Sequence, residues 1–214
     1  MNKNINIPFP QKQYCVIYAD PPWAYDNHAS RAAAASHYET MTQEDIAALP
    51  VPEIAAKDCT LFLWATFPML KQALEIIEAW GFHYKTCAFT WIKQNPRGDE
   101  LFMGIGNWTR SNAEVCLLAT RGKPKRVCKK VRSVIVSHIE QHSKKPDETR
   151  RRIDELMGDV PRIELFARTR AIGWDSWGNE VLDEGFCNDA RVSAEQNDPA
   201  ATMGQGDVNS NIAP

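Results

Sequence analysis

No apolar run in the sequence approaches the roughly 20 residues of a membrane span, and no charged segment followed by an apolar one opens the chain. The six cysteines include no C-x-x-C pair, and the five histidines lack the spacing of metal ligands. Internal repeats are also absent. These absences argue against a membrane protein, a disulfide-stapled secreted domain and a metalloprotein. We therefore expect a soluble, cytoplasmic protein with reduced cysteines and no bound metal.

Charge and composition divide the chain into two parts. The net charge of the 214 residues is −2, but residues 183–214 hold six acids and one base, so the remainder carries +3. After Val181 the hydrophobic periodicity ends, and Asn, Asp, Gly and Ala dominate. We predict one domain of ordinary size over residues 1–182 and a disordered acidic tail over 183–214.

A basic strip, Arg121 to Arg132, contains seven bases and no acid. Such a strip suits contacts with the phosphates of a nucleic acid. It equally suits a solvated loop, and charge alone leaves both alternatives open.

Short apolar runs alternate with segments of helical periodicity. Strands are predicted over residues 14–19, 60–65, 86–93, 114–120, 134–137 and 162–166. Helices are predicted after Thr42 as N-cap, from Pro68 to Trp80 and from Pro146 to Met157. The alternation predicts an α/β fold with a mainly parallel sheet and helices on both faces. A long loop from Gln94 to Asn112 is expected to be functional.

Asp20-Pro21-Pro22-Trp23 directly follows the first predicted strand, which places it at the carboxyl edge of the sheet, where α/β folds bind ligands. An exocyclic amino group of adenine is a poor nucleophile because its lone pair is delocalised into the ring. The Asp20 carboxylate and a backbone carbonyl of the Pro-Pro turn could accept its two N–H bonds and direct the lone pair towards a methyl donor. Trp23 and Tyr25 are candidates to stack on the base. A tight turn closed by an aromatic residue is the structural alternative.

The motif and six further segments resemble the successive blocks of the DPPW-type adenine N6-methyltransferases, which include the eukaryotic mRNA methyltransferase and bacterial and phage DNA methylases. The further segments are His37 to Met41, Leu61 to Trp64, Trp91 to Lys93, Lys144 to Glu148, Glu164 to Arg168 and Trp177 to Glu180. The collinear blocks span residues 14–181, which is more specific than any single motif.

The resemblance implies a Rossmann-like, S-adenosylmethionine-dependent methyltransferase fold in circularly permuted order, with the catalytic block before the cofactor-binding strand. It implies that Asp20 and Pro21 grip the amino group and that Trp23 and Tyr38 line the adenine pocket. The cofactor residues implied are Asp20, Lys145, Arg168, Arg170, Asn179 and Glu180, and for Lys145 the resemblance implies contact with either the cofactor carboxylate or the substrate. Arg170 stands where relatives often have histidine, and Glu180 where the mRNA enzyme has glutamine.

The long loop adds Asn107, Trp108 and Arg110 as candidate contacts with nucleic acid, although a structural role fits them as well. Trp64, Trp80 and Trp91 lie in periodic segments and are expected in the core. We predict methylation of adenine N6 in DNA, with no covalent enzyme intermediate. The alternatives are cytosine N4 methylation, RNA adenine methylation and a non-catalytic nucleic-acid-binding scaffold. The target sequence stays open, as does the oligomeric state, for which a homodimer is one candidate.

Overall fold

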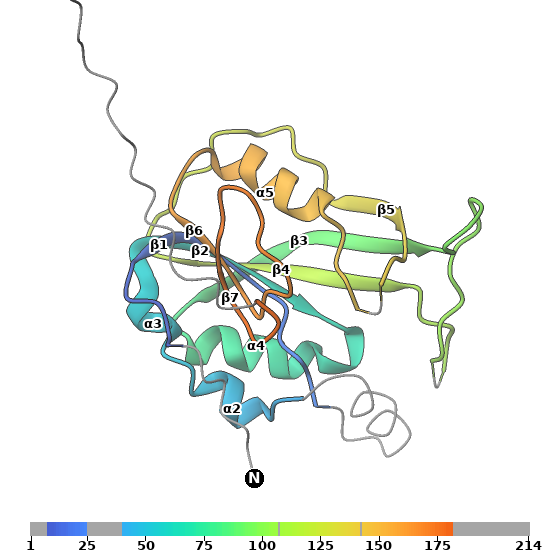
Figure 1. Cartoon of the computed structure of the whole chain (residues 1–214), viewed down its shortest axis with the longest axis horizontal. Coiled ribbons are helices and arrows are strands. Elements are labelled where there is room, and N and C mark those ends of the chain that lie inside the picture. Colours follow the sequence, from blue (N-terminus) through green and yellow to red (C-terminus); the bar gives the residue numbers. More distant parts are fainter. Residues whose placement is uncertain (1–7, 25–39, 107, 142, 182–214) are drawn as a thin grey trace, which may run out of the picture. The chain divides into compact units, whose positions relative to one another are not determined.

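The structure is a computed structural model that describes residues 8–24, 40–106, 108–141 and 143–181 (Figure 1). These residues form one sheet of seven strands in the order β5-β3-β4-β2-β1-β6-β7. The strands are β1 (Tyr14–Ala19), β2 (Ala55–Ala65), β3 (His83–Gln94), β4 (Ala113–Arg121), β5 (Val134–His138), β6 (Arg162–Leu165) and β7 (Asp175–Trp177). The predicted strands are therefore confirmed, whereas β7 and the first half of β2 were not predicted.

The sheet is parallel except for one strand. Parallel pairs join β1 to β2 and β6, β3 to β5, and β6 to β7. Strand β4 runs antiparallel to both of its neighbours, β2 and β3. The predicted α/β class, with a mainly parallel sheet, is confirmed, and the order of the strands is consistent with the expected Rossmann-like fold.

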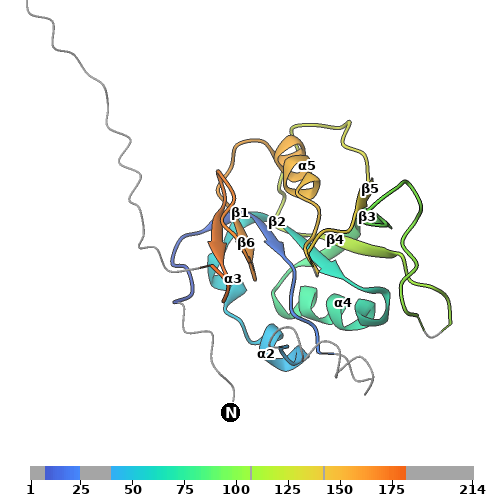
Figure 2. The ribbon, with the colours of Figure 1, turned by 45° about the vertical axis from the view of Figure 1, so that its right-hand side comes forward.

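Helices cover both faces of the sheet, as predicted (Figures 1 and 2). Helices α2 (Gln43–Ala47), α3 (Val51–Ile54) and α4 (Leu70–Ala79) lie on one face, and α5 (Glu148–Met157) lies on the other. Thr42 caps α2 by accepting a hydrogen bond from the Asp45 amide at 3.1 Å. Pro52 lies in the first turn of α3, where proline costs no hydrogen bond.

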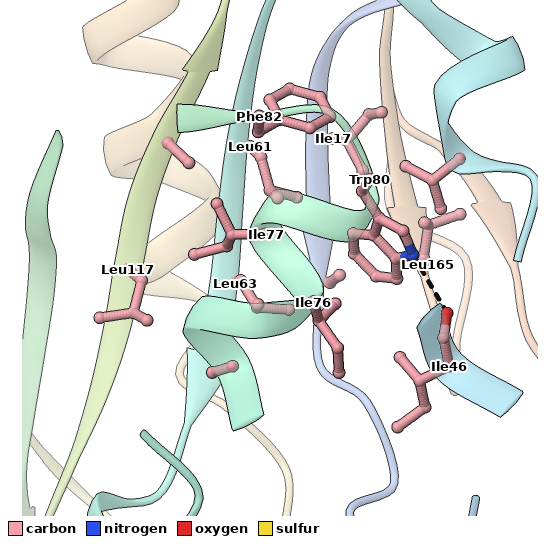
Figure 3. Close-up of a cluster of buried hydrophobic side chains, with 14 of the residues drawn as sticks. Ile17, Ile46, Leu61, Leu63, Ile76, Ile77, Trp80, Phe82, Leu117 and Leu165 are labelled. Carbon is pink, nitrogen blue, oxygen red and sulfur yellow. Dashed lines mark hydrogen bonds between the residues drawn. The ribbon is translucent and has the colours of Figure 1, made fainter. Parts of the chain in front are cut away.

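Each face of the sheet has its own hydrophobic cluster. On the α4 face, Trp80 is fully buried, and its indole N–H donates to the Ile46 carbonyl of α2 at 3.0 Å (Figure 3). On the α5 face, Trp64 and Trp91 are buried in the second cluster. The expectation that these three tryptophans belong to the core is confirmed.

The strand directions decide which segments meet. Parallel strands β1, β2, β3, β5 and β6 all end at one edge of the sheet, here called the carboxyl edge. Because β4 is antiparallel, its first residues lie at this edge as well. Asp20, the loop of residues 95–112 and the segment before α5 therefore converge there.

The basic strip lies at the opposite, amino edge, because it joins the end of antiparallel β4 to the start of β5. The Val127 amide in this strip donates to the Leu156 carbonyl, near the end of α5, at 2.8 Å. The length of the strands thus separates the strip from Asp20. Among the described residues, no helix is long and apolar enough to cross a membrane. The predicted tail, 183–214, falls outside the described residues.

Candidate active site

The Asp20-Pro21-Pro22-Trp23 turn is held by its own backbone. Asp20 follows the last residue of β1, and the Trp23 amide donates to the Pro21 carbonyl at 2.9 Å. The Met41 amide donates to the Pro22 carbonyl, also at 2.9 Å. Since a carbonyl oxygen has two lone pairs, each of these carbonyls can accept one further hydrogen bond. The turn therefore holds two fixed carbonyls next in sequence to the Asp20 carboxylate.

Four side chains of alternating charge meet at the carboxyl edge and form what we call the charge chain. The Lys145 ammonium lies 2.7 Å from a carboxylate oxygen of Asp20 and 3.3 Å from one of Glu114. Glu114 in turn forms an ion pair with Lys93. The exposed fractions of the four side chains are only 10% for Lys145, 14% for Glu114, 20% for Lys93 and 23% for Asp20. Buried charges of this kind need partners, and here each has at least one.

Each member of the charge chain comes from a different segment. Lys93 is near the end of β3 and Glu114 near the start of β4, so the hairpin of these two strands brings them together. Lys145 lies just before α5, and its ammonium also stands 5.6 Å from the centroid of the Trp64 ring. Lys145 was predicted as a site residue, whereas Glu114 and Lys93 were missed. Only the antiparallel direction of β4 places Glu114 at the edge that holds Asp20.

Burial and the neighbouring charges set the proton affinities of this cluster. Burial raises the pKa of Asp20 above its ordinary value, and Lys145 offsets only part of that rise. For Glu114, burial also acts upwards, but Lys145 and Lys93 together outweigh it and lower the pKa. Burial acts to lower the pKa of Lys145, yet the two carboxylates raise it overall. Lys145 therefore stays charged, and Asp20 is the carboxylate more ready to take a proton.

Arg150 fastens the segment that carries Lys145 to the sheet. Its guanidinium donates to Glu164 of β6 at 2.8 Å and also pairs with Asp147 at the start of α5. Burial raises the pKa of Glu164, and Arg150 opposes that rise. The first turn of α5 is thus tied to β6, beside the strand that ends at Asp20.

The predicted cofactor residues after β6 and β7 lie in two adjacent segments. Arg168 and Glu180 form an ion pair with 3.6 Å between the guanidinium Nε and a carboxylate oxygen. A side chain on Gly178 would place its Cβ 2.2 Å from the Ala167 carbonyl oxygen, so only glycine permits this close approach. Asn179 and Arg170 are exposed nearby in sequence. Arg168 is also close enough to Asp20 to lower its pKa.

The remaining predicted residues are placed differently from one another. Trp23 is buried in the α4-face cluster, and its indole N–H donates to the Trp64 carbonyl at 3.2 Å. Trp108 and Arg110 are exposed in the loop of residues 95–112. Tyr25, Tyr38 and Asn107 lie outside the described residues. The part of the chain that the structure describes contains no group of three or more side chains arranged to hold a metal ion.

Comparison with known proteins identifies relatives over almost the whole described chain. The family model MT-A70 matches residues 14–180. The type II methyltransferase M.MunI of a Mycoplasma species is 36% identical over 194 residues, covering 81% of this chain and 80% of the relative. The human N(6)-adenosine-methyltransferase catalytic subunit METTL3 is 30% identical over 173 residues, covering 79% of this chain and 28% of the relative.

An N(6)-adenosine-methyltransferase MT-A70-like protein of Arabidopsis thaliana is 31% identical, covering 78% of this chain and 23% of the relative. The chain therefore spans about four fifths of the bacterial relative but only about a quarter of these two eukaryotic ones.

Proposed function

Because the chain belongs to the MT-A70 family, the DPPW-type adenine N6-methyltransferases, we propose that it methylates the N6 amino group of adenine in DNA, with S-adenosylmethionine as methyl donor. The observation that carries this proposal is the Asp20 carboxylate, partly buried at the carboxyl edge and held by Lys145 next to a fixed Pro-Pro turn. Similarity to a type II methyltransferase along four fifths of both chains favours DNA over RNA.

The turn offers two acceptors for the two N–H bonds of the target amine. Asp20 would accept one through its carboxylate, and the Pro21 carbonyl would accept the other through its remaining lone pair. Two such bonds draw the nitrogen towards tetrahedral geometry, which localises the lone pair on the nitrogen. The charge chain keeps the Asp20 carboxylate in place for this role.

S-adenosylmethionine supplies a methyl group on a sulfonium, which accepts the electrons of the broken S–C bond. The amine nitrogen then forms the new N–C bond and has one proton too many. Asp20, which would already accept a hydrogen bond from this nitrogen, has a raised pKa that suits it to take that proton before water does. No covalent bond to the protein is required.

Lys145 and the residues after β6 and β7 fit such a donor chemically. An ammonium, two guanidinium groups and an amide are the groups that bind the carboxylate, the ribose hydroxyls and the adenine edge of the cofactor. Lys145, Arg168 and Asn179 would make these contacts, with Arg170 and Glu180 beside them. The close packing at Gly178 holds the two segments together and supports this assignment.

We further propose that the protein works in the cytoplasm of a bacterium or of a phage host, where such DNA is found. RNA adenine methylation is the second candidate, and the similarity to N(6)-adenosine-methyltransferases favours it. A scaffold without activity would have no use for a partly buried carboxylate that is paired with Lys145.

Digestion of treated nucleic acid to nucleosides, followed by mass spectrometry, tests the proposal. The protein is incubated with S-adenosylmethionine and either mixed-sequence duplex DNA, the same DNA heat-denatured, or RNA. N6-methyladenine in DNA is the expected result. The same base in RNA alone would replace the proposal by the second candidate, and N4-methylcytosine would overturn the adenine assignment.

A further inference from the structure

The loop that joins β3 to β4, residues 95–112, exposes large apolar side chains at the carboxyl edge. Ile105 is 96% exposed and Trp108 is 99% exposed, and Leu101 and Met103 are more than half exposed. The other described tryptophans are all buried. Such a gathering of exposed apolar groups on one projecting loop marks a contact surface.

The loop is built to present these side chains. The Phe102 amide donates to the Lys93 carbonyl of β3 at 2.8 Å, and the Gly104 amide donates to the Ser111 carbonyl across the loop at 3.0 Å. A Cβ on Gly104 would lie 2.1 Å from the Ser111 carbonyl oxygen, and one on Gly106 would lie 1.8 Å from that of Thr109. The two glycines therefore let the backbone on the two sides of the loop approach closely.

The position of the loop links it to the charge chain. It begins just after Lys93 and ends just before Glu114. Trp108 is six residues from Glu114, which is at most about 20 Å of extended chain. Residues 101–112 contain no acid and one base, Arg110. Residues 101–112 can therefore approach the phosphates of DNA without electrostatic repulsion.

We propose that the tip of the loop, with Trp108 and Ile105 foremost, inserts into the base stack of duplex DNA and fills the space left when the target adenine turns out. This inference rests on the proposed function and goes further, because it commits the enzyme to a duplex substrate and assigns the loop to opening it. Apolar and aromatic side chains serve in this way where proteins unstack bases. The flat indole ring replaces the lost stacking with a contact that is independent of sequence.

The test compares one DNA in two forms, so that the wedge and the chemistry are measured separately. Methyl transfer to mixed-sequence duplex DNA and to the same DNA after heat denaturation is followed for the wild type, Trp108→Ala and Ile105→Ala. Tyr84→Ala is the matched control, because it removes a half-exposed aromatic ring at the other end of β3. A single strand has no stack to open, so only the duplex needs the wedge.

For Trp108→Ala we expect the rate on duplex DNA to fall on the order of ten- to a hundredfold, the value of a lost stacking contact, with little change on denatured DNA. Ile105→Ala should do the same more weakly, and the control should match the wild type. An equal loss on both forms would overturn the wedge. A change of oligomeric state in light scattering would also overturn it and would identify the loop as a contact between copies.

A wild type that methylates only denatured DNA would also overturn the inference while leaving the proposed function intact. A wild type that is inactive on both forms would instead refute the proposed function.

Discussion

Removal of Lys145 and removal of the Glu114 charge should shift the pH at which activity is lost on acidification in opposite directions. Asp20 must be ionised to accept the N–H of the amine, so kcat/KM is present above its pKa and falls as the pH drops through it. Burial raises that pKa, Lys145 lowers it and Glu114 raises it. Removal of Lys145 should therefore move the acid limb to higher pH, and removal of the Glu114 charge should move it to lower pH.

The contact distances set the size of the two shifts. Lys145 lies 2.7 Å from Asp20, and an opposite charge at such a distance lowers a carboxyl pKa by roughly 1 to 3 units. Lys145→Met should raise the limb by that amount. The Asp20 and Glu114 oxygens lie on either side of one nitrogen, within about 6 Å of each other. At that range the like charges repel more weakly, and Glu114→Gln should lower the limb by about one unit.

The assay is the pH profile of kcat/KM for DNA at saturating S-adenosylmethionine, which reports the ionisation of the enzyme before DNA binds. Lys12→Met, which removes an exposed lysine paired with Asp175, serves as the control and should leave the profile unchanged. An acid limb that stays at the wild-type pH in both charge-chain variants would refute the reasoning. A shift in the same direction in both would also refute it.

Three further predictions concern other parts of the molecule. Trp80→Phe removes a buried hydrogen bond and some core volume, so urea unfolding should show a loss of about 2 kcal/mol. Gly178→Ala would force a Cβ against Ala167, and calorimetry should show at least roughly tenfold weaker binding of S-adenosylmethionine, a cost of about 1.4 kcal/mol or more. Gly81→Ala, which meets no atom within 4 Å but keeps a positive φ, is its control. The basic strip lies at the amino edge, away from Asp20. Joint neutralisation of Lys125, Lys129 and Lys130 should therefore change the slope of log affinity for DNA against log salt concentration by less than one.

Local sequence was enough to predict the elements that hold the catalytic motif. The apolar run from Tyr14 to Ala19 reads as a buried strand because both of its faces are apolar, and Asp20 and the prolines end it. The capping oxygen of Thr42 predicts the start of α2, and Pro68 predicts the start of the helical segment that contains α4. Such signals depend on a few neighbouring residues, so they can be interpreted without knowledge of the tertiary fold.

Strand direction could not be predicted in the same way. Nothing in residues 113–121 distinguishes a parallel from an antiparallel strand, because β4 is buried in the middle of the sheet in either case. Its antiparallel direction moves Glu114 to the carboxyl edge and the basic strip to the amino edge. The candidate site thus gained two residues, Glu114 and Lys93, that sequence patterns did not indicate, and the basic strip stands away from it.

Trp23 shows a second limit. A tryptophan after a Pro-Pro turn suggests an exposed stacking surface, but its indole N–H finds a buried partner in the Trp64 carbonyl. That partner is 41 residues away in sequence, so no local pattern reveals it. Its assignment to the adenine pocket stays a prediction.

The measurement that tests the central claim most directly is the rate of N6-methyladenine formation in DNA by Asp20→Asn, against Asp175→Asn as a control in which a half-exposed, ion-paired carboxylate is replaced. The account predicts that Asp20→Asn loses at least roughly a hundredfold in kcat, with a melting temperature close to that of the wild type, while Asp175→Asn keeps its activity. Wild-type rates in Asp20→Asn would contradict the claim that Asp20 acts on the reacting amine.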